Sequence, residues 1–168
     1  MDGTLSYIIN EDDPELRQPI YNSIEEWDKE ITGLVFEEVS NRRDAEVEIY
    51  FREDGKELAG ETRNYFDRYG FITKSYVSIS KGAFGIGFNM DQIEQIAKHE
   101  MGHVLGLGHA TFDGSLMTER VNPQAGSISD CEIEAVYEAN HWKLKQEDGY
   151  DNNDHSIYYP NRDYIECN

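Results

Sequence analysis

One stretch of eleven residues constrains this chain more than any other, since residues 99–109 hold three of its five histidines. His99 and His103 are one helical turn apart, so they would project from the same face of a helix and could bind one metal ion. Gly106 would allow a sharp bend, because glycine adopts the left-handed conformation that ends helices. The bend would return His109 as a third ligand. Three nitrogen ligands and one open position are typical of catalytic zinc, so the stretch predicts a zinc site.

The residues before this motif have the periodicity of an amphipathic helix. At about 100° per residue, one apolar arc contains Ile93, Ile96, Ala97, Met101, Val104 and Leu105. The opposite side contains Asp91, Glu94, Gln95, Lys98 and Gly102. Glu100 falls inside the apolar arc, where an unpaired carboxylate is costly. Water bound to zinc would offset that cost. Asp91 with Glu94 predicts an acidic capping box at the start of the helix.

Chance is a weak explanation for this pattern. A single His-x-x-x-His pair on a helix is usually incidental. Here five fixed positions occur within eleven residues, although histidine is a rare residue in average composition. We therefore predict that the site binds zinc.

The length and net charge of the chain limit which kinds of protein and partner are compatible with it. The chain has 168 residues, which suits one domain with a sizeable core. Its net charge of −19 comes from 34 acidic and 15 basic residues, which argues against nucleic acid and anionic membranes as partners. We favour a solvated acidic surface over a preference for basic substrates. No apolar run reaches the roughly 20 residues of a membrane span.

The two cysteines, Cys131 and Cys167, do not form a zinc-type Cys-x-x-Cys pair. A disulfide between them would tie the C-terminal tail to the last helix and would suit an extracellular protein. Two free thiols are an equal alternative. No signal peptide is visible, and the sequence enters a strand-like segment at once, which favours a chain cut from a longer precursor.

Periodicity and turn residues predict the order of elements before the zinc helix. Strands are expected at residues 4–9, 34–39, 45–51, 58–66 and 71–80. A helix is expected at residues 14–31, with Asp13 as N-cap and Pro14 at its first position. A closing helix should begin near Ser129, with Glu132 as its capping partner.

The last two predicted strands read as a hairpin whose first member is polar. Glu61, Arg63 and Asn64 make that segment a candidate edge strand, since charges at an edge discourage aggregation. An edge strand can also bind an extended peptide by backbone pairing. The glycine-rich residues 82–87 lack the Lys-Ser/Thr of a phosphate loop and read as a flexible connection.

With Met117 placed eight residues after His109, the segment from His99 to Met117 resembles the metzincin zinc peptidases. It is most similar to the matrixin, or matrix-metalloproteinase-like, type. The resemblance implies an α+β, metzincin-like catalytic domain over residues 1–142, with a twisted mixed sheet of about five strands and three main helices. It leaves residues 143–168 as an acidic C-terminal tail packed on the same domain.

The resemblance also implies roles for single residues. Zinc would be held by His99, His103 and His109, with the bend of the zinc helix at Gly106, and Glu100 would be the general base. Met117 would form an apolar floor beneath the metal, and residues 118–128 would wall a substrate pocket. The edge strand that pairs with substrate would comprise Leu58, Ala59, Gly60, Glu61 and Thr62.

The chain departs from the matrixin pattern at several positions. Ala110 stands where these enzymes have serine, and Thr118-Glu119-Arg120 replaces their Pro-x-Tyr pocket wall. No histidine precedes the zinc helix to bind a second, structural zinc. No cysteine-switch pro-segment is visible. These differences bear on pocket specificity and on activation.

These observations predict a zinc-dependent endopeptidase in which Glu100 activates a zinc-bound water to hydrolyse peptide bonds. The alternative is a zinc-loaded peptide-binding module that is catalytically silent, or latent because its cleft is covered. The retained Glu100 favours the enzyme. We expect a peptide or protein substrate, no nucleic-acid partner, a monomer, and an extracellular or cell-surface location. A Ca²⁺ site in the acidic tail or at the carbonyls of residues 82–87 is a smaller alternative to a solvated tail.

Overall fold

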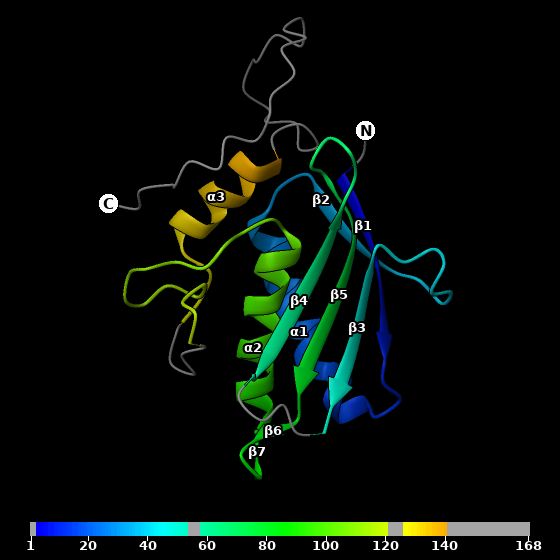
Figure 1. Ribbon diagram of the computed structural model, residues 1–168, viewed down its shortest axis with the longest axis vertical. Coiled ribbons are helices and arrows are strands. Elements are labelled where there is room, and N and C mark those ends of the chain that lie inside the picture. Colours follow the sequence, from blue (N-terminus) through cyan, green and yellow to red (C-terminus); the bar gives the residue numbers. More distant parts are fainter. Residues whose placement is uncertain (1–2, 54–57, 121–125, 141–168) are drawn as a thin grey trace, which may run out of the picture.

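The structure is a computed structural model that describes residues 3–53, 58–120 and 126–140. These residues form a five-stranded mixed sheet, a two-stranded hairpin and three helices (Figure 1). In chain order the elements are β1 (Gly3–Asn10), α1 (Pro14–Glu30), β2 (Leu34–Glu38), β3 (Val47–Arg52), β4 (Gly60–Phe66), β5 (Ile72–Ser80), β6 (Gly82–Ala83), β7 (Ile86–Gly87), α2 (Met90–Val104) and α3 (Asp130–Asn140). The predicted α+β architecture is confirmed.

Helix α1 begins and ends where the sequence predicts. The Asp13 carboxylate accepts a hydrogen bond from the Glu15 N–H at 2.9 Å, and Pro14 occupies the first turn, where no backbone donor is needed. The cap residue Ile31 donates its N–H to the Trp27 carbonyl. Trp27 is fully buried and donates its indole N–H to the Lys98 carbonyl of α2 at 3.0 Å. Helix α1 is thereby joined directly to the zinc helix.

The five-stranded sheet has the order β2-β1-β3-β5-β4. Strands β2, β1, β3 and β5 are parallel, and β4 runs antiparallel to β5 at one edge. The hairpin and the edge position predicted for the polar segment are therefore confirmed. Pairing extends one residue ahead of β4, since Ser80 donates its N–H to the Ala59 carbonyl at 2.9 Å.

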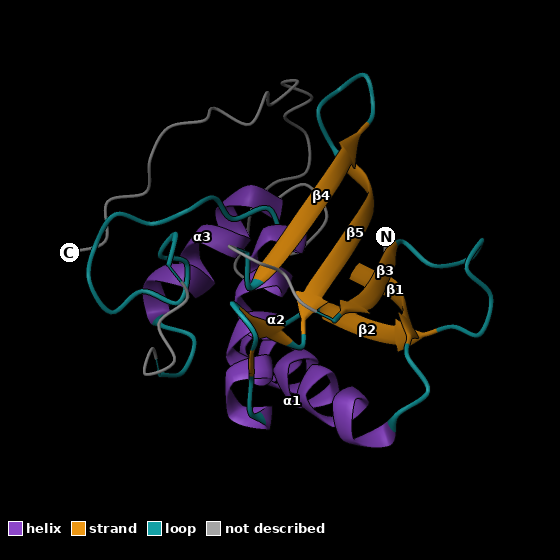
Figure 2. Ribbon diagram, turned by 60° about the horizontal axis from the view of Figure 1, so that its bottom comes forward, coloured by secondary structure: helices purple, strands orange, loops and turns teal. Residues whose placement is uncertain are grey.

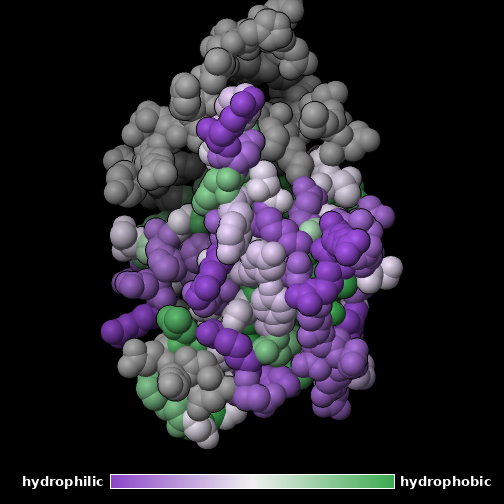
Figure 3. Space-filling model, turned by 45° about the vertical axis from the view of Figure 1, so that its right-hand side comes forward, coloured by the Kyte–Doolittle hydropathy of each residue, from purple (hydrophilic) through white to green (hydrophobic). Residues whose placement is uncertain are grey.

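The helices and the sheet form two layers. Figure 2 shows α1 and α2 side by side against one face of the sheet, and the molecular surface turned forward in Figure 3 is mostly hydrophilic. The core between the layers includes Ile20, Ile24, Trp27, Val47, Ile49, Val77, Ile79, Ile93, Ile96 and Met101. Alternate residues of β3 and β5 supply its sheet side, as the period of two predicts.

Helix α2 differs from the prediction in its N-terminal cap and in the burial of its polar side. Its capping box lies two residues earlier than predicted, because Asn89 is the N-cap and Gln92 its reciprocal partner, in place of Asp91 and Glu94. Both pairs satisfy the same spacing rule, and the amide pair has the correct backbone position.

The side of α2 opposite the apolar arc is also less exposed than its polar residues suggest. Lys98 is 3% exposed and pairs with Glu26 of α1. Gly102 is buried. Glu94 accepts a hydrogen bond from Asn22 of α1 at 2.7 Å. This side of the helix therefore packs on α1, and its polar residues are matched by polar partners.

Two further parts of the chain differ from the predicted elements or lie outside the described residues. Residues 82–87, expected as a connection, form the hairpin β6–β7. The predicted tail (143–168), Cys167 and part of the predicted pocket wall (121–125) lie outside the described residues. Within the described part of the chain, no helix has the length and apolar character needed to cross a membrane.

Candidate metal centre

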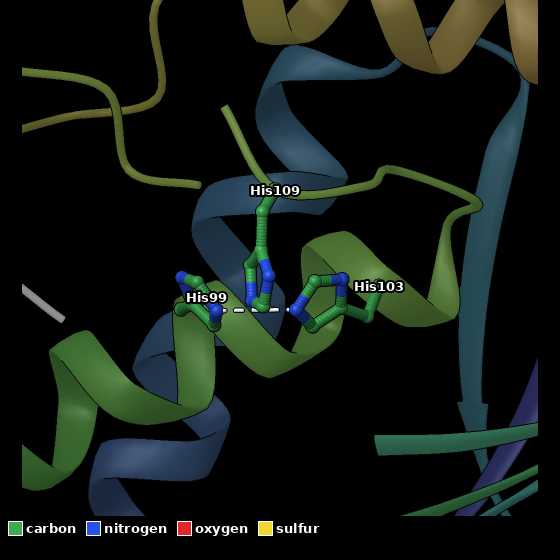
Figure 4. Close-up of side chains that lie close together, drawn as sticks. All are labelled: His99, His103 and His109. Atoms are coloured by element: carbon green, nitrogen blue, oxygen red, sulfur yellow. Dashed lines mark hydrogen bonds between the residues drawn. The ribbon is translucent and has the colours of Figure 1, made fainter. Parts of the chain in front are cut away.

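The structure brings His99, His103 and His109 together (Figure 4). One ring nitrogen from each lies within 4.8 Å of the others, and the ring centroids are 4.8 to 5.5 Å apart. Among the described residues this is the only group of three or more His, Cys, Asp or Glu side chains placed to share a metal ion. No group of described acidic side chains supports a Ca²⁺ site, and the acidic tail lies outside the described residues.

Two of the three rings are oriented by backbone carbonyls. His99 Nδ1 lies 2.8 Å from the Leu116 carbonyl, and His103 Nδ1 lies 2.8 Å from the Leu107 carbonyl. A carbonyl can only accept, so both neutral rings must carry their proton on Nδ1. Each Nε2 is then left with a lone pair, as is usual for metal-binding histidines.

Those two Nε2 atoms are only 3.1 Å apart. Two lone pairs at that distance repel each other unless a cation lies between them. Nitrogens bound to one tetrahedral zinc at about 2.0–2.1 Å would be about 3.4 Å apart, close to the separation observed. The donor set, its protonation and its spacing therefore fit zinc.

The bend after α2 follows from Gly106. Its φ of +95° lies in the left-handed region that glycine adopts without strain. The Leu107 N–H bonds the Gly102 carbonyl at 3.0 Å, and Asn140 of α3 donates its side-chain N–H to the Leu105 carbonyl at 2.8 Å. The turn that places His109 is thus tied to both helices.

Burial controls the protonation of the histidines. It lowers the pKa of His99 to about 4 and also lowers the pKa of His103, with the neighbouring histidines adding to the effect. Both imidazoles are therefore neutral near pH 7, which is the form that binds a metal.

Glu100 lies beside the triad without belonging to it. Its side chain is 3% exposed, and its Oε2 accepts a hydrogen bond from Thr62 Oγ1 at 2.6 Å. Burial raises the pKa of Glu100 to about 7, although the Thr62 bond opposes that change. A carboxylate with this pKa can both accept and release a proton near neutral pH.

Met117 lies under α2 and is almost fully buried. A Cβ added at Gly102 would lie 2.4 Å from Met117 Sδ and 3.5 Å from the Trp27 ring. Met117 is also bonded to the residue that follows the third histidine, because Ala110 donates its N–H to the Met117 carbonyl at 2.7 Å. At Gly102, therefore, helix α2 packs directly against the side chain of Met117.

We expect Gly102→Val to lower the free energy of unfolding by about 1–3 kcal/mol, because the new side chain overpacks Met117 and Trp27. Urea unfolding followed by tryptophan fluorescence, at one fixed zinc concentration, measures the change. Gly108→Val is the matched control, since among the described residues, its two chain neighbours aside, no atom lies within 4 Å of a Cβ at that position. Equal unfolding midpoints for the two variants would contradict the contact.

Glu132 of α3 connects the closing helix to the first zinc ligand. Its Oε1 accepts hydrogen bonds from Ser115 Oγ at 2.6 Å and from the Leu116 N–H at 2.7 Å. Its Oε2 accepts two more from Ser129, at 2.7 and 2.6 Å. The carbonyl of the same Leu116 accepts from His99. The predicted Ser129–Glu132 cap is confirmed. Glu132 also fixes the backbone of Leu116, whose carbonyl orients His99.

Burial alone would raise the pKa of Glu132, but the hydrogen bonds from Ser115, Ser129 and Leu116 outweigh it and lower the pKa. A carboxylate with a lowered folded-state pKa contributes stability above its unfolded pKa of about 4.5, and that stability is lost as the pH falls through the folded pKa. We therefore expect Glu132→Gln to lower the free energy of unfolding at pH 7 by about 1–3 kcal/mol.

Urea unfolding at several pH values tests this expectation. The difference between Glu132→Gln and the unsubstituted chain should shrink as the pH falls from about 4.5, the unfolded pKa, through the lower pKa of the folded chain. Glu134→Gln, at an exposed position of the same helix, serves as control. If the loss of unfolding free energy in Glu132→Gln were the same at every pH, the effect would come from the shape of the side chain and not from the charge of Glu132.

The remaining predicted site residues are placed as follows. Leu58 is 52% exposed and Ala59 partly buried just before β4, while Gly60, Glu61 and Thr62 begin that strand. Cys131 lies in the first turn of α3 and is not a free thiol. Its pairing with Cys167 stays a prediction.

Sequence reasoning missed three contacts that support the site. Thr62 was considered only for substrate pairing, yet it bonds Glu100. Asn64 donates its side-chain N–H to the His103 carbonyl at 2.8 Å, and the buried Lys98 pairs with the partly exposed Glu26. Thr62 and Asn64, two polar residues two positions apart in β4, were the available signal for the first two contacts, because such residues share one face.

Comparison with known proteins agrees with this geometry. A sequence model described as matrixin matches residues 3–139. A search of curated proteins found no match.

Solved structures of similar fold include two of myroilysin, both 12% identical, with TM-scores of 0.55 and 0.54. Each covers 83% of this chain, and the matched regions are 80% and 84% of the two myroilysin chains. Archaemetzincin from Methanopyrus kandleri is 10% identical with a TM-score of 0.55, over 81% of this chain and 94% of its own. At these identities the structural likeness supports the fold.

Proposed function

The chain belongs to the matrixin family, and we infer that it is a zinc-dependent endopeptidase. Membership supports a zinc metallopeptidase in general. The proposal of peptide hydrolysis at this site rests on one observation: a buried carboxylate, Glu100, lies one residue from a cluster of three imidazoles whose oriented nitrogens fit zinc.

His99, His103 and His109 would hold the ion. When bound, zinc supplies a Lewis acid for the peptide carbonyl and makes water a stronger acid near neutral pH. The protein itself orients the histidine rings. The Leu116 and Leu107 carbonyls keep the proton of each helical histidine on Nδ1, and the bend at Gly106 returns the third ring to the other two.

Glu100 is proposed as the general base and then the general acid. As a carboxylate it takes a proton from the attacking water, and as a carboxylic acid it delivers that proton to the departing amine. A pKa of about 7 suits both steps, because the driving force for proton transfer is then small in each direction.

The edge strand β4 is the proposed platform for the substrate. Its outer edge lacks a partner strand among the described residues, so an extended peptide can add to it by backbone hydrogen bonds. Residues 58–62 lie on this edge, beside the helix that carries Glu100. We propose a peptide or protein substrate, an extracellular location and a monomeric enzyme.

The test is cleavage of a mixed pool of quenched-fluorescent peptides by the chain loaded with one equivalent of zinc. Mass spectrometry of the products should show cuts within the peptides and not only at their ends. Fluorescence anisotropy with the same peptides measures binding without cleavage. Binding with no cleavage, at verified zinc stoichiometry, would reject the enzyme and favour a zinc-loaded binding module.

A further inference from the structure

We infer that Thr62 is a positioning residue for Glu100: its hydroxyl orients the carboxylate in a slot that Gly60 leaves open in β4. The inference rests on the proposed function, in which Glu100 is the base. It adds to that function the residue that aligns the base.

The contact between Thr62 and Glu100 is short and buried. Thr62 Oγ1 lies 2.6 Å from Glu100 Oε2 and 3.2 Å from the Glu100 backbone carbonyl. Within the described residues, no other hydrogen bond reaches this carboxylate. In its carboxylate form, which is the form that acts as a base, Glu100 only accepts hydrogen bonds, so the Thr62 hydroxyl is the donor. One donor therefore determines which oxygen is engaged and how the carboxylate is rotated.

Gly60 provides the space for the second oxygen. A Cβ at position 60 would lie 2.3 Å from Glu100 Oε1 and 2.8 Å from Cδ and Cγ. Real Cβ atoms do not approach other atoms so closely. Any side chain at this position would therefore displace the carboxylate from its present place.

The two contacts come from the same face of one strand. Residues 60 and 62 are two positions apart in β4, where successive side chains alternate between faces. Asn64, two positions further, donates to the His103 carbonyl at 2.8 Å and accepts from Ser75 Oγ of β5 at 2.7 Å. One face of β4 thus contacts both the proposed base and the turn of α2 that carries the second zinc ligand.

Strand β4 is itself held against the sheet, with Gly60 opposite Ile79 and Thr62 opposite Val77 of β5. Both partners are buried. A strand fixed in this way can align a side chain on the neighbouring helix with little motion. The same strand is the proposed platform for the peptide, so β4 would position both the substrate and the base.

Loss of the Thr62 hydroxyl should therefore impair the reaction more than binding. For Thr62→Val, which keeps the shape, we expect kcat to fall by about 10–100-fold, since a small misplacement of a reacting group has effects of this size. KM should change by less than about threefold, because backbone pairing along β4 is retained. Thr62→Ser restores the hydroxyl and should recover most of kcat.

An unchanged kcat in Thr62→Val would overturn the inference. So would an equal loss of kcat in Thr62→Ser, because that loss would follow from the methyl group, and so would a loss expressed in KM alone. Bound zinc, measured for each variant, should equal that of the unsubstituted chain.

A second readout does not depend on catalysis. Thr62→Val should lower the melting temperature of the chain, because it leaves a buried carboxylate without its donor. In a Glu100→Ala background the same substitution should have a clearly smaller effect, since the two residues are coupled. The remote Thr73→Val on β5 should show the same shift in both backgrounds.

Equal shifts for Thr62→Val in the two backgrounds would overturn the inference. If the unsubstituted chain cleaves no peptide, the proposed peptidase function is rejected, independently of the contact between Thr62 and Glu100. The melting cycle then decides whether Thr62 positions Glu100.

Discussion

Glu100→Gln should reduce peptide cleavage by the zinc-loaded chain by about 10²–10⁴-fold, the usual range for loss of a general acid–base. Glutamine has nearly the same shape and can still accept the hydrogen bond from Thr62, but it cannot take a proton from water. The three histidines are untouched, so the zinc content should stay at one equivalent. The measurement is the cleavage rate of the peptide pool at equal zinc loading.

Asp91→Asn is the matched control for this substitution. It makes the same change from carboxylate to amide in the same helix, at an exposed position in the first turn. Its cleavage rate should equal that of the unsubstituted chain. Retained cleavage in Glu100→Gln would remove Glu100 from the mechanism, whereas loss of zinc in that variant would assign it to metal binding.

Removal of zinc should abolish cleavage and lower the melting temperature. The three histidines come together only in the folded chain, where the bend at Gly106 brings His109 to His99 and His103, so bound zinc stabilises the folded state over the unfolded one. A ligand present at 1,000 times its Kd stabilises the folded state by about 4 kcal/mol. Cleavage and melting should be measured after chelation and after stepwise return of zinc.

Magnesium is the control ion, because it prefers oxygen ligands and should restore neither activity nor stability at an imidazole site. His103→Ala should behave like the chelated chain and should not recover when zinc is added. Full cleavage by a chain verified to be free of metal would refute a zinc-dependent mechanism.

The local part of the site was predictable from the sequence, because its geometry is set over short distances. His99 and His103 are one helical turn apart, and Gly106 occupies the left-handed position that the bend requires. The turn residues between two strand-like segments predicted the hairpin of β4 and β5, since turn chemistry is also a local property. The family resemblance then agreed with both observations.

The rest of the site depends on partners that are distant in the chain. Periodicity separated the two sides of α2, but it could not show that α1 covers the polar side and matches Lys98 with Glu26. Thr62 and Glu100 are 38 residues apart. Their contact follows from the position of β4 at the edge of the sheet, next to α2, which no local pattern encodes.

The packing of Gly102 on Met117 has a consequence for how this motif is read in other chains. The two residues between Glu100 and His103 are usually written as free positions, yet the second of them is restricted to glycine here by the methionine beneath it. Relatives that keep the methionine at the position of Met117 should therefore also keep a very small residue at the position of Gly102. Redesign of either position should begin with both.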